Sequence, residues 1–543
     1  MSTTEQAPDR QVDELTAAGC ERIPTELASG SRGAVRPERE KCLDRPGPLT
    51  AGGGRPERRV PVEFQVSEDP GFKHVVKSGT VIASPELGHS VHPEIHGLRP
   101  SRHYWYRFRV GKHHSPVGRT RTAPTPGTMP SSLRFAIASC QSYEAGYYTS
   151  YRHMAEEDLD LVVHLRDYIY EKSYVADPIL HRGEPLPDYL RIPCYDLMRY
   201  RLQYALYKSD TLLQAAHAMC PWVTTFDDHE VSAVWPYVDD PSDMPAAYNE
   251  RKAAGFQAMY ENLPLRHDQM PYGHDIRIHR RIRYGDLADF TMLDTRQYRS
   301  SHEGHIDPDA TMLGGRQRDW LIEGFSSSRA RWQIIGNQAP MVQIDRDPDP
   351  EVESWYGSWD GGFVTERNLV LTEAHERGVE NLIVTTGDRH CNYLADLKTD
   401  FDDPDSPVVG TEIVGTSISS QRDDADLPEQ GVDYLRTNPW LEFYNQQRGY
   451  CRVTLTPDSL TNDYRVMPYV SQPGDPITTR ATAVVEHGRP GGDLEGGHPH
   501  RRAVTQEVRE SRAATRPGPG VADRWCVIGS PEEWRATRHR VRR

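Results

Sequence analysis

The sequence predicts a large α/β domain preceded by a small antiparallel β-domain. Residues 131–488 contain short apolar runs that end abruptly in charged or phenolic side chains and that are separated by helical patterns, for example at 147–157 and 195–219. Such runs are typical of buried strands that deliver polar groups at their carboxyl ends. Residues 59–123 instead alternate between apolar and polar side chains, with frequent turn signals, which indicates antiparallel strands.

The N-terminal domain is predicted to be a small fibronectin III-like β-sandwich that spans residues 59–123. One part of it resembles the corner of a fibronectin type III module, where a tyrosine hydroxyl holds a loop. The residues that carry this resemblance are Leu98, Pro100, Tyr104 and Tyr106. If these tyrosines serve only as apolar strand residues, the sandwich prediction is unchanged.

Both flanks differ in composition from the two domains. Residues 1–58 and 489–543 are rich in Gly, Pro and Arg and lack sustained periodicity, so we expect them to be mostly disordered. Neither an apolar signal core nor a twin-arginine leader is visible before residue 59, and no run of 18 apolar residues predicts a membrane span. One hypothesis for the foreign composition is a shifted reading frame or a mis-assigned start.

The charge balance limits the classes of partner. The chain has 64 basic and 79 acidic residues, a net charge of -15, which argues against a broad nucleic-acid surface. A phosphorylated substrate remains compatible with this charge, because bound metal ions supply positive charge locally. The eight cysteines are scattered without a C-x-x-C pair, so they say little about redox compartment.

Four predicted strands end in side chains that bind metals. The apolar runs are 135–138, 161–165, 222–226 and 382–386. The polar groups that follow them include Cys140, Asp167, Tyr170, Asp228, His229, Asp388 and His390. Each group has a simpler interpretation: a buried cysteine, a packed tyrosine, a helix N-cap with an acidic first turn, or a solvated turn. Four such ends in one segment nevertheless favour a shared metal site.

Several longer motifs also favour a shared metal site in this segment. They are Ser139-Cys140-Gln141, Asp167-Tyr168-Ile169-Tyr170-Glu171, Asp227-Asp228-His229-Glu230-Val231, Leu293-Asp294-Thr295-Arg296-Gln297-Tyr298-Arg299, Gly336-Asn337-Gln338, Gly387-Asp388-Arg389-His390, Val414-Gly415-Thr416-Ser417-Ile418-Ser419 and Asn445-Gln446-Gln447-Arg448-Gly449-Tyr450. In identity and order they resemble the PhoD-type alkaline phosphatases, a branch of the metallophosphoesterase superfamily that includes some phospholipases D. The similarity covers about residues 60–488.

The resemblance implies a fold, an activity and a set of ions. The fold is an α/β metallophosphoesterase domain of two facing mixed sheets flanked by helices, after the β-sandwich. The activity is hydrolysis of phosphate monoesters, and of diesters as a second class, by a metal-activated water. The ions are Fe(3+) and one or two Ca(2+). Fe(3+) prefers anionic oxygen and thiolate ligands, whereas Ca(2+) prefers carboxylate and carbonyl oxygens.

The resemblance also implies roles for individual residues. The expected metal ligands are Cys140, Asp167, Tyr170, Asp228, Asp388 and His390. Asp228 stands where the wider superfamily has a bridging Asn, and we expect it to take part in catalysis. The expected substrate-binding residues are Tyr168, His229 and Arg296, of which His229 and Arg296 are also catalytic candidates. Arg296 offers phosphate a bidentate fork, although an ion pair with Asp294 or another buried acid is the favoured alternative.

The chain departs from the family pattern in three places. Arg166 stands where a Gly usually precedes the metal-bridging Asp, Ser232 and Ala233 replace an Asn pair, and Arg199 replaces an acid. If the backbone at residue 166 needs a positive φ or a close approach to metals, an arginine strains or crowds the site.

The sequence is also compatible with two functions other than that of a phosphatase. One is a phospholipase D-like phosphodiesterase, and another is an inactive metal-binding relative that acts as a binding module. The expected substrate is a phosphate-ester small molecule or a phospholipid. By resemblance, we expect a monomer that is secreted or held at the cell surface.

Overall fold

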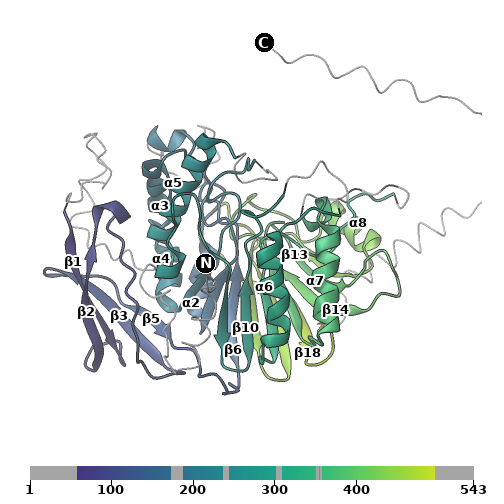
Figure 1. Ribbon diagram of the computed structural model, residues 1–543, viewed down its shortest axis with the longest axis horizontal. Helices are drawn as coiled ribbons and strands as arrows, with labels where there is room; N and C mark the ends of the chain where they lie inside the picture. Colours follow the sequence, from purple (N-terminus) through teal and green to yellow (C-terminus); the bar gives the residue numbers. More distant parts are fainter. Residues whose placement is uncertain are drawn as a thin grey trace, which may run out of the picture. The chain divides into compact units, whose positions relative to one another are not determined.

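The structure of the protein is a computed structural model, shown in Figure 1. It describes residues 58–172, 188–236, 244–300, 308–349 and 358–495, together with residues 352 and 354. The segments 1–57 and 496–543, for which the sequence predicts disorder, lie outside the described residues.

The N-terminal region forms an antiparallel sheet, as the alternating pattern predicts. Its strands are β1 (Val60–Ser67), β2 (Val75–Ala83), β3 (His103–Val110), β4 (His113–His114) and β5 (Gly118–Arg121). The spatial order is β2-β1-β3-β4, and β5 pairs with β3. The side chains that pack on one face of this sheet include Val62, Val66, Ile95, Leu98, Tyr104, Tyr106 and Phe108.

The predicted tyrosine corner is present, and Tyr104 forms it. The Tyr104 side chain is buried, and its hydroxyl oxygen accepts a hydrogen bond from the backbone N–H of Arg99 at 3.0 Å. This bond holds the loop that enters β3. Tyr106 instead packs over Gly118, where an added Cβ would lie 2.3 Å from the tyrosine ring.

The second domain is built on two seven-stranded mixed sheets. The first sheet contains, in spatial order, β19 (Asp493–Leu494), β18 (Thr478–Glu486), β17 (Ser459–Val466), β16 (Gly449–Leu455), β6 (Leu133–Ala138), β7 (Leu161–His164) and β8 (Trp222–Thr224). The second contains β15 (Leu441–Asn445), β13 (Asn392–Lys398), β14 (Val408–Val414), β12 (Leu382–Thr386), β11 (Trp332–Gly336), β10 (Ala288–Met292) and β9 (Arg280–Tyr284). Strand β19 continues the fold beyond the predicted boundary at residue 488.

The alternation along β6 shows how the layers are stacked. Leu133, Phe135 and Ile137 belong to a core cluster that also contains side chains of the second sheet, so this face lies between the two sheets. Ala136 and Ala138 point the other way, into a cluster with the helices. The expected fold of two facing mixed sheets flanked by helices is therefore confirmed.

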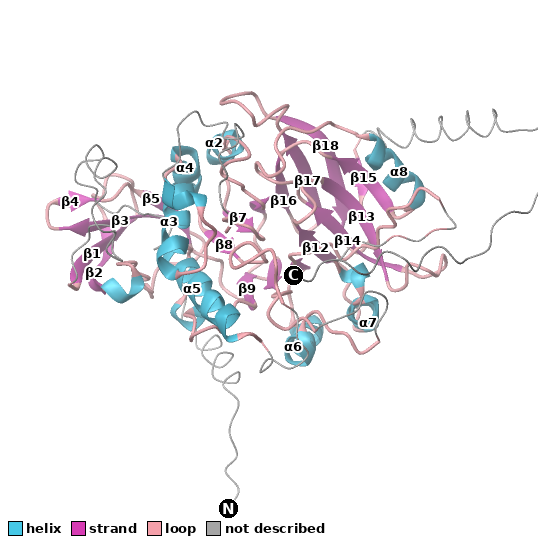
Figure 2. Cartoon of the chain, turned by 90° about the horizontal axis from the view of Figure 1, so that it is seen from above, coloured by secondary structure: helices cyan, strands magenta, loops and turns pink. Residues whose placement is uncertain are grey.

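Helices cover the outer faces of the sheets (Figure 2). The helices packed on the first sheet are α2 (Thr149–Glu156), α3 (Leu197–Tyr207), α4 (Thr211–Met219) and α5 (Ala246–Asn262). The helices on the side of the second sheet are α6 (Gly314–Ser327), α7 (Val364–Glu376) and α8 (Glu429–Thr437). Short 3-10 helices occur at Pro85–Leu87, Asp188–Arg191, His267–Gln269 and Trp359–Gly361. None of the described helices is long and apolar enough to cross a membrane.

One helical prediction needs correction. The pattern at 195–219 contains two helices, because α3 ends at Tyr207 and α4 begins at Thr211. Between them, the carboxylate of Asp210 accepts hydrogen bonds from the backbone N–H groups of Leu212 and Leu213. An N-cap of this kind marks the beginning of a separate helix.

The sheet topology brings the polar strand ends together. Strands β6, β7 and β8 are parallel neighbours, so their carboxyl ends meet at one edge of the first sheet. Strand β12 runs parallel to β11 and β14 in the facing sheet. The four apolar runs of the sequence therefore end where the two sheets face each other.

His92 connects the segment between β2 and β3 of the N-terminal domain to the second domain. Its buried ring stacks on Tyr260 with 4.4 Å between centroids, and Nδ1 lies 2.9 Å from the carbonyl oxygen of Leu265. Burial lowers the pKa of His92 to about 4. The folded protein therefore resists protonation at this position more strongly than the unfolded chain does.

We expect the stability of the protein to fall as the pH is lowered from about 6.5 to about 4, in part because of His92. In that window the unfolded chain binds a proton that the folded state excludes, a difference of up to about 3 kcal/mol. Denaturation of His92→Gln against pH should give a flatter curve than the wild type. The exposed His96, changed to Gln, is the matched control, and parallel curves for H92Q and wild type would contradict the prediction.

Candidate metal centre

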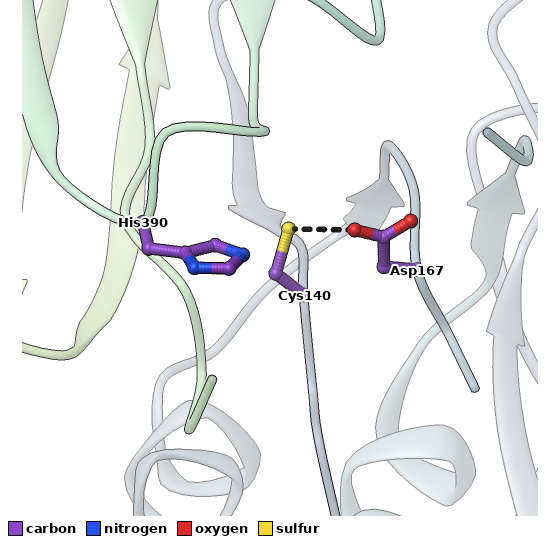
Figure 3. A group of neighbouring side chains, drawn as sticks. All are labelled: Cys140, Asp167 and His390. Carbon is purple, nitrogen blue, oxygen red and sulfur yellow. Dashed lines mark hydrogen bonds between the residues drawn. The ribbon is translucent and has the colours of Figure 1, made fainter. Parts of the chain in front are cut away.

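Four predicted ligands converge at the edge of the two sheets. Cys140, Asp167 and His390 each offer a ligand atom, and these atoms lie within 4.8 Å of one another (Figure 3). The Cys140 Sγ and the Tyr170 hydroxyl each lie 3.4 Å from Asp167 Oδ2. The Tyr170 hydroxyl is also 3.4 Å from His390 Nε2. Thiol, phenol, carboxylate and imidazole groups from distant parts of the chain thus share one location.

The backbone at these strand ends is strained. Cys140, Asp167, Asp388 and His390 have φ values of 55°, 52°, 75° and 55°, in the left-handed region that side chains other than glycine rarely adopt. They are four of the nine such residues in the described chain. Each strand turns sharply as it ends, which directs these side chains to the centre. Strain of this kind concentrates at functional sites.

Surrounding groups hold these ligands in place. Ser420 Oγ lies 2.7 Å from the Tyr170 hydroxyl and 2.7 Å from the Cys140 carbonyl oxygen. The buried guanidinium of Arg448 hydrogen-bonds the His390 carbonyl and pairs with Asp424. Ser420 follows a predicted motif directly, and a serine at such a position carries no signal of its own in the sequence.

His229 lies beside this group with its own orienting acid. Its Nδ1 is 2.7 Å from Glu171 Oε2, and the Glu171 carboxylate also accepts the Ala233 N–H at 2.8 Å. Burial alone would lower the pKa of His229, but the charge of Asp167 and the hydrogen bond to Glu171 outweigh it and raise the pKa to about 9. These two interactions favour the imidazolium form of His229, which can donate a proton.

The Asp-Asp-His-Glu segment is a turn, not the start of a helix. The carboxylate of Glu230 accepts the backbone N–H of Tyr168 at 2.5 Å and that of Asp227 at 2.9 Å. It thereby joins the segments that follow β7 and β8. The N-cap interpretation of this motif does not apply, because no helix begins within residues 227–236.

Arg166 places its guanidinium among four carboxylates. Its Nε lies 3.0 Å from Asp167 Oδ2, its Nη1 2.6 Å from Asp227 Oδ2 and its Nη2 2.6 Å from Asp228 Oδ1. Nη1 also pairs with Asp388 Oδ1. Arg166 is not among the residues with positive φ, so the expected backbone strain at this departure from the family is absent. The expected crowding of the site is what the structure shows.

Arg296 forms the ion pair that was the favoured alternative. Its guanidinium binds both carboxylate oxygens of Asp227, with Nη2 2.8 Å from Oδ2. Nη2 also lies 3.6 Å from Asp228 Oδ1, at the margin of the acidic cluster. Burial would raise the pKa of Asp227, but Arg166 and Arg296 hold it well below its usual range. The phosphate-binding role of Arg296 stays a prediction.

Tyr168 lies away from the centre, so its predicted contact with substrate is not supported. Its fully buried ring packs against Tyr204 in the core between the first sheet and the helices, and its hydroxyl is 2.8 Å from His217 Nε2. Asp167 and Tyr170 turn toward the centre, whereas Tyr168 points to the opposite side. The direction of each side chain in this turn depends on the left-handed backbone at Asp167, which the sequence does not reveal.

The other two departures have structural roles. Arg199 is buried and its Nε donates to the carbonyl of Ile192 at 2.8 Å, while Nη1 donates to Gln203 at 2.7 Å. Gln203 in turn donates to the Tyr170 carbonyl. Ser232 Oγ accepts from Arg251 at 2.9 Å. Arg199 and Ser232 thus form hydrogen bonds close to the metal centre and are not part of its ligand group.

The residues on the thiol side fit a metal ion. Asp167 Oδ1 is buried and has no hydrogen-bond partner among the described residues, an expensive arrangement unless a cation lies nearby. Burial raises the pKa values of Cys140 and Tyr170 well above their usual ranges, and the charge of Asp167 adds to this effect. A multivalent cation would compensate by favouring thiolate and phenolate. Asp228 and Asp388, in contrast, already hold Arg166.

Comparisons with known proteins agree with this geometry. Residues 135–464 match the family model of the PhoD-like phosphatase, and residues 33–124 match the N-terminal domain of the PhoD-like phosphatase. Alkaline phosphatase D of Bacillus subtilis (strain 168) is 40% identical over 457 residues, which cover 82% of this chain and 78% of the relative. A solved structure of PhoD is 38% identical, with a TM-score of 0.77, and the match covers 86% of this chain and 93% of that one.

The family model covers more than half of the chain, and the sequence identity to a phosphatase extends over most of it. The same segment carries the converging thiol, phenol, carboxylate and imidazole groups. The chain therefore belongs to the PhoD-like phosphatase family and is a metal-dependent phosphoester hydrolase.

Proposed function

We propose that the chain hydrolyses phosphate monoesters in preference to diesters at the centre formed by Cys140, Asp167, Tyr170 and His390. The proposal rests on the convergence of these four donors beside the imidazole of His229, whose pKa is raised by Asp167 and Glu171. A phosphate monoester brings up to two negative charges, which a cation and an imidazolium neutralise together.

We propose that the resident ion on the thiol side is Fe(3+), held by Cys140, Asp167, Tyr170 and His390. A trivalent ion suits a donor set with a thiol, a phenol and a carboxyl group, because each becomes an anionic ligand. When bound, it supplies Lewis-acid chemistry for attack on phosphorus. Ca(2+) is the second ion that family resemblance suggests, but the carboxylates of Asp228 and Asp388, which would meet it, already hold the guanidinium of Arg166.

His229 is proposed to protonate the leaving group. The hydrogen bond to Glu171 raises the pKa of His229, which favours the imidazolium form, and the same 2.7 Å contact at Nδ1 fixes the orientation of the ring. Nε2 is therefore the nitrogen left to face a substrate, 3.8 Å from Asp228 Oδ2. General acid catalysis requires a positioned proton donor of this kind.

The site supports a small-molecule phosphate ester as substrate, and a phospholipid is the class that the diester alternative would require. We further propose that the protein is a monomer that acts outside the cytoplasm or at the cell surface. Light scattering of the purified chain tests the first point, and fractionation of the cells that express it tests the second.

Replacing Tyr170 by Phe should remove the phenolate component from the visible absorption of the iron-loaded protein, while the Cys140 thiolate keeps a charge-transfer absorption of its own. A phenolate bound to Fe(3+) gives a charge-transfer transition, whereas a phenyl ring gives none. Absorption spectra, with iron content measured on the same samples, check this outcome. Tyr168→Phe is the matched control, because that hydroxyl lies in the core beside His217, and its band should persist. Iron-replete wild-type protein without a visible band would contradict the ligand set.

His229→Asn should reduce turnover most for esters with poor leaving groups. Loss of a general acid typically costs about 10²–10⁴-fold, and less when the leaving group needs no proton. The rates of p-nitrophenyl phosphate and of an alkyl phosphate should therefore diverge in the variant. Glu171→Gln should show a smaller effect of the same kind, because it disturbs the orientation of His229. An equal loss for both esters would assign His229 to phosphate binding instead.

The monoester p-nitrophenyl phosphate should have a higher kcat/KM than bis-p-nitrophenyl phosphate. The reason is charge: a dianion gains more than a monoanion from a cation and an imidazolium. Steady-state kinetics with each ester checks the order. A faster reaction with the bis-ester or with a phosphatidylcholine vesicle would favour a phospholipase D-like phosphodiesterase.

A further inference from the structure

The guanidinium of Arg166 uses all three of its nitrogen atoms on carboxylates. Nε contacts Asp167 at 3.0 Å, Nη2 contacts Asp228 at 2.6 Å, and Nη1 contacts Asp227 at 2.6 Å. Nη1 also pairs with Asp388. These four acids come from the ends of β7, β8 and β12, so one side chain joins three strand ends. An arginine that pairs with four acids, of which Asp167 and Asp227 are buried and Asp228 and Asp388 are partly buried, is part of the framework of the site.

The position of this side chain leaves it little freedom. Arg166 is 4% exposed, and its Cγ lies 3.4 Å from where a Cβ on Gly387 would be. Asp167 and Asp227 are buried as well. To bind a phosphate, the guanidinium would have to release a buried carboxylate, which is costly. We therefore expect Arg166 to neutralise these carboxylates and not to bind the phosphate of the substrate.

The contacts of Arg166 divide the centre into two sides. On one side, Cys140 and Tyr170 face Asp167 Oδ2 at 3.4 Å, with His390 beside them. On the other side, the carboxyl oxygens of Asp228 and Asp388 face the guanidinium. The two carboxylates that face the guanidinium offer the hard oxygen ligands that Ca(2+) or a similar divalent ion prefers, and the imidazole of His229 lies beside them, with Nε2 3.8 Å from Asp228 Oδ2. A guanidinium already stands among these oxygens.

We propose that Arg166 is a built-in cation that replaces a divalent metal ion between Asp228 and Asp388, so that this chain binds metal on the thiol side alone. The inference builds on the proposed metal centre but does not require turnover. Arg166 and Arg296 together contribute a formal charge of +2 against -4 from Asp167, Asp227, Asp228 and Asp388. Without Arg166 the cluster has a formal charge of -3, which calls for a further cation.

Arginine suits this role for two reasons. Its guanidinium stays charged at all ordinary pH values and carries five N–H donors in a plane, which matches several carboxylates at once. The same carboxyl oxygens cannot also coordinate a metal ion at 2.3–2.6 Å, the usual range for Ca(2+). Arg166 and a divalent ion therefore compete for one place.

The test compares calcium binding to the wild type, Arg166→Gly and Arg166→Lys, each loaded with iron. Equilibrium dialysis against Ca(2+), followed by elemental analysis, should give about one more bound ion per chain for Arg166→Gly than for the wild type. Arg166→Lys retains a cation and should bind as the wild type does. Equal calcium binding by the wild type and Arg166→Gly would overturn the proposal.

Thermal unfolding provides a second measurement on the same proteins. With a chelator of calcium present, Arg166→Gly should melt at a lower temperature than the wild type, because its carboxylates lose their counter-ion. Added Ca(2+) should raise the melting temperature of Arg166→Gly and leave that of the wild type unchanged. If Arg166→Gly does not fold, the wild type decides the question by itself: a rise in its melting temperature with Ca(2+) that Asp388→Asn removes would overturn the proposal.

These outcomes remain separate from the fate of the proposed activity. Hydrolysis of p-nitrophenyl phosphate by the wild type without calcium tests the phosphatase function. A calcium difference between the wild type and Arg166→Gly supports the built-in cation even if neither protein turns over this ester. Turnover with equal calcium binding would retain the function and reject the role of Arg166.

Discussion

The centre depends on the neutralisation of one buried carboxylate, Asp167. It stands in a left-handed conformation at the end of β7, and its Oδ2 contacts the thiol of Cys140, the hydroxyl of Tyr170 and the guanidinium of Arg166. A buried carboxylate without compensating charge costs several kcal/mol. The surrounding strand ends are arranged so that donors and cations reach this group from both sides.

The two sheets supply that arrangement. Parallel neighbours β6, β7 and β8 end at a common edge, and β12 ends opposite them in the facing sheet. Positive φ values at the turns direct the side chains inward. Because rigid strands lie beneath each turn, the ligands keep their positions, as binding of a metal and an ester requires.

Two basic residues neutralise most of the acidic cluster beside the centre. Arg296 holds the fully buried Asp227, and Arg166 holds that residue together with Asp228 and Asp388. The acidic half of the centre is thereby stabilised by the chain itself. On the thiol side, Asp167 Oδ1 is buried without a hydrogen-bond partner among the described residues, and this is where we expect an external cation to bind.

Local patterns revealed much of the architecture. Period-two alternation located the N-terminal sheet, and apolar runs located β6, β7, β8 and β12, because burial on both faces leaves a clear signal in composition. The division of 195–219 into two helices was missed, although Asp210 is a typical N-cap residue. Ser420 and Glu230 were missed as positioning residues, because hydrogen bonds between distant segments leave no periodic trace.

The fold class and the residue types that gather at the centre can be predicted from local patterns in the chain, since residues that end parallel strands of one sheet must meet at its edge. The partners of these residues emerge only when distant segments pack together. The tertiary structure turned Tyr168 into the core, paired Arg296 with Asp227 and placed Arg166 among four acids. The physical reason is that side-chain direction at a strand end depends on one or two backbone dihedrals, and ion pairing depends on distances between segments far apart in the chain.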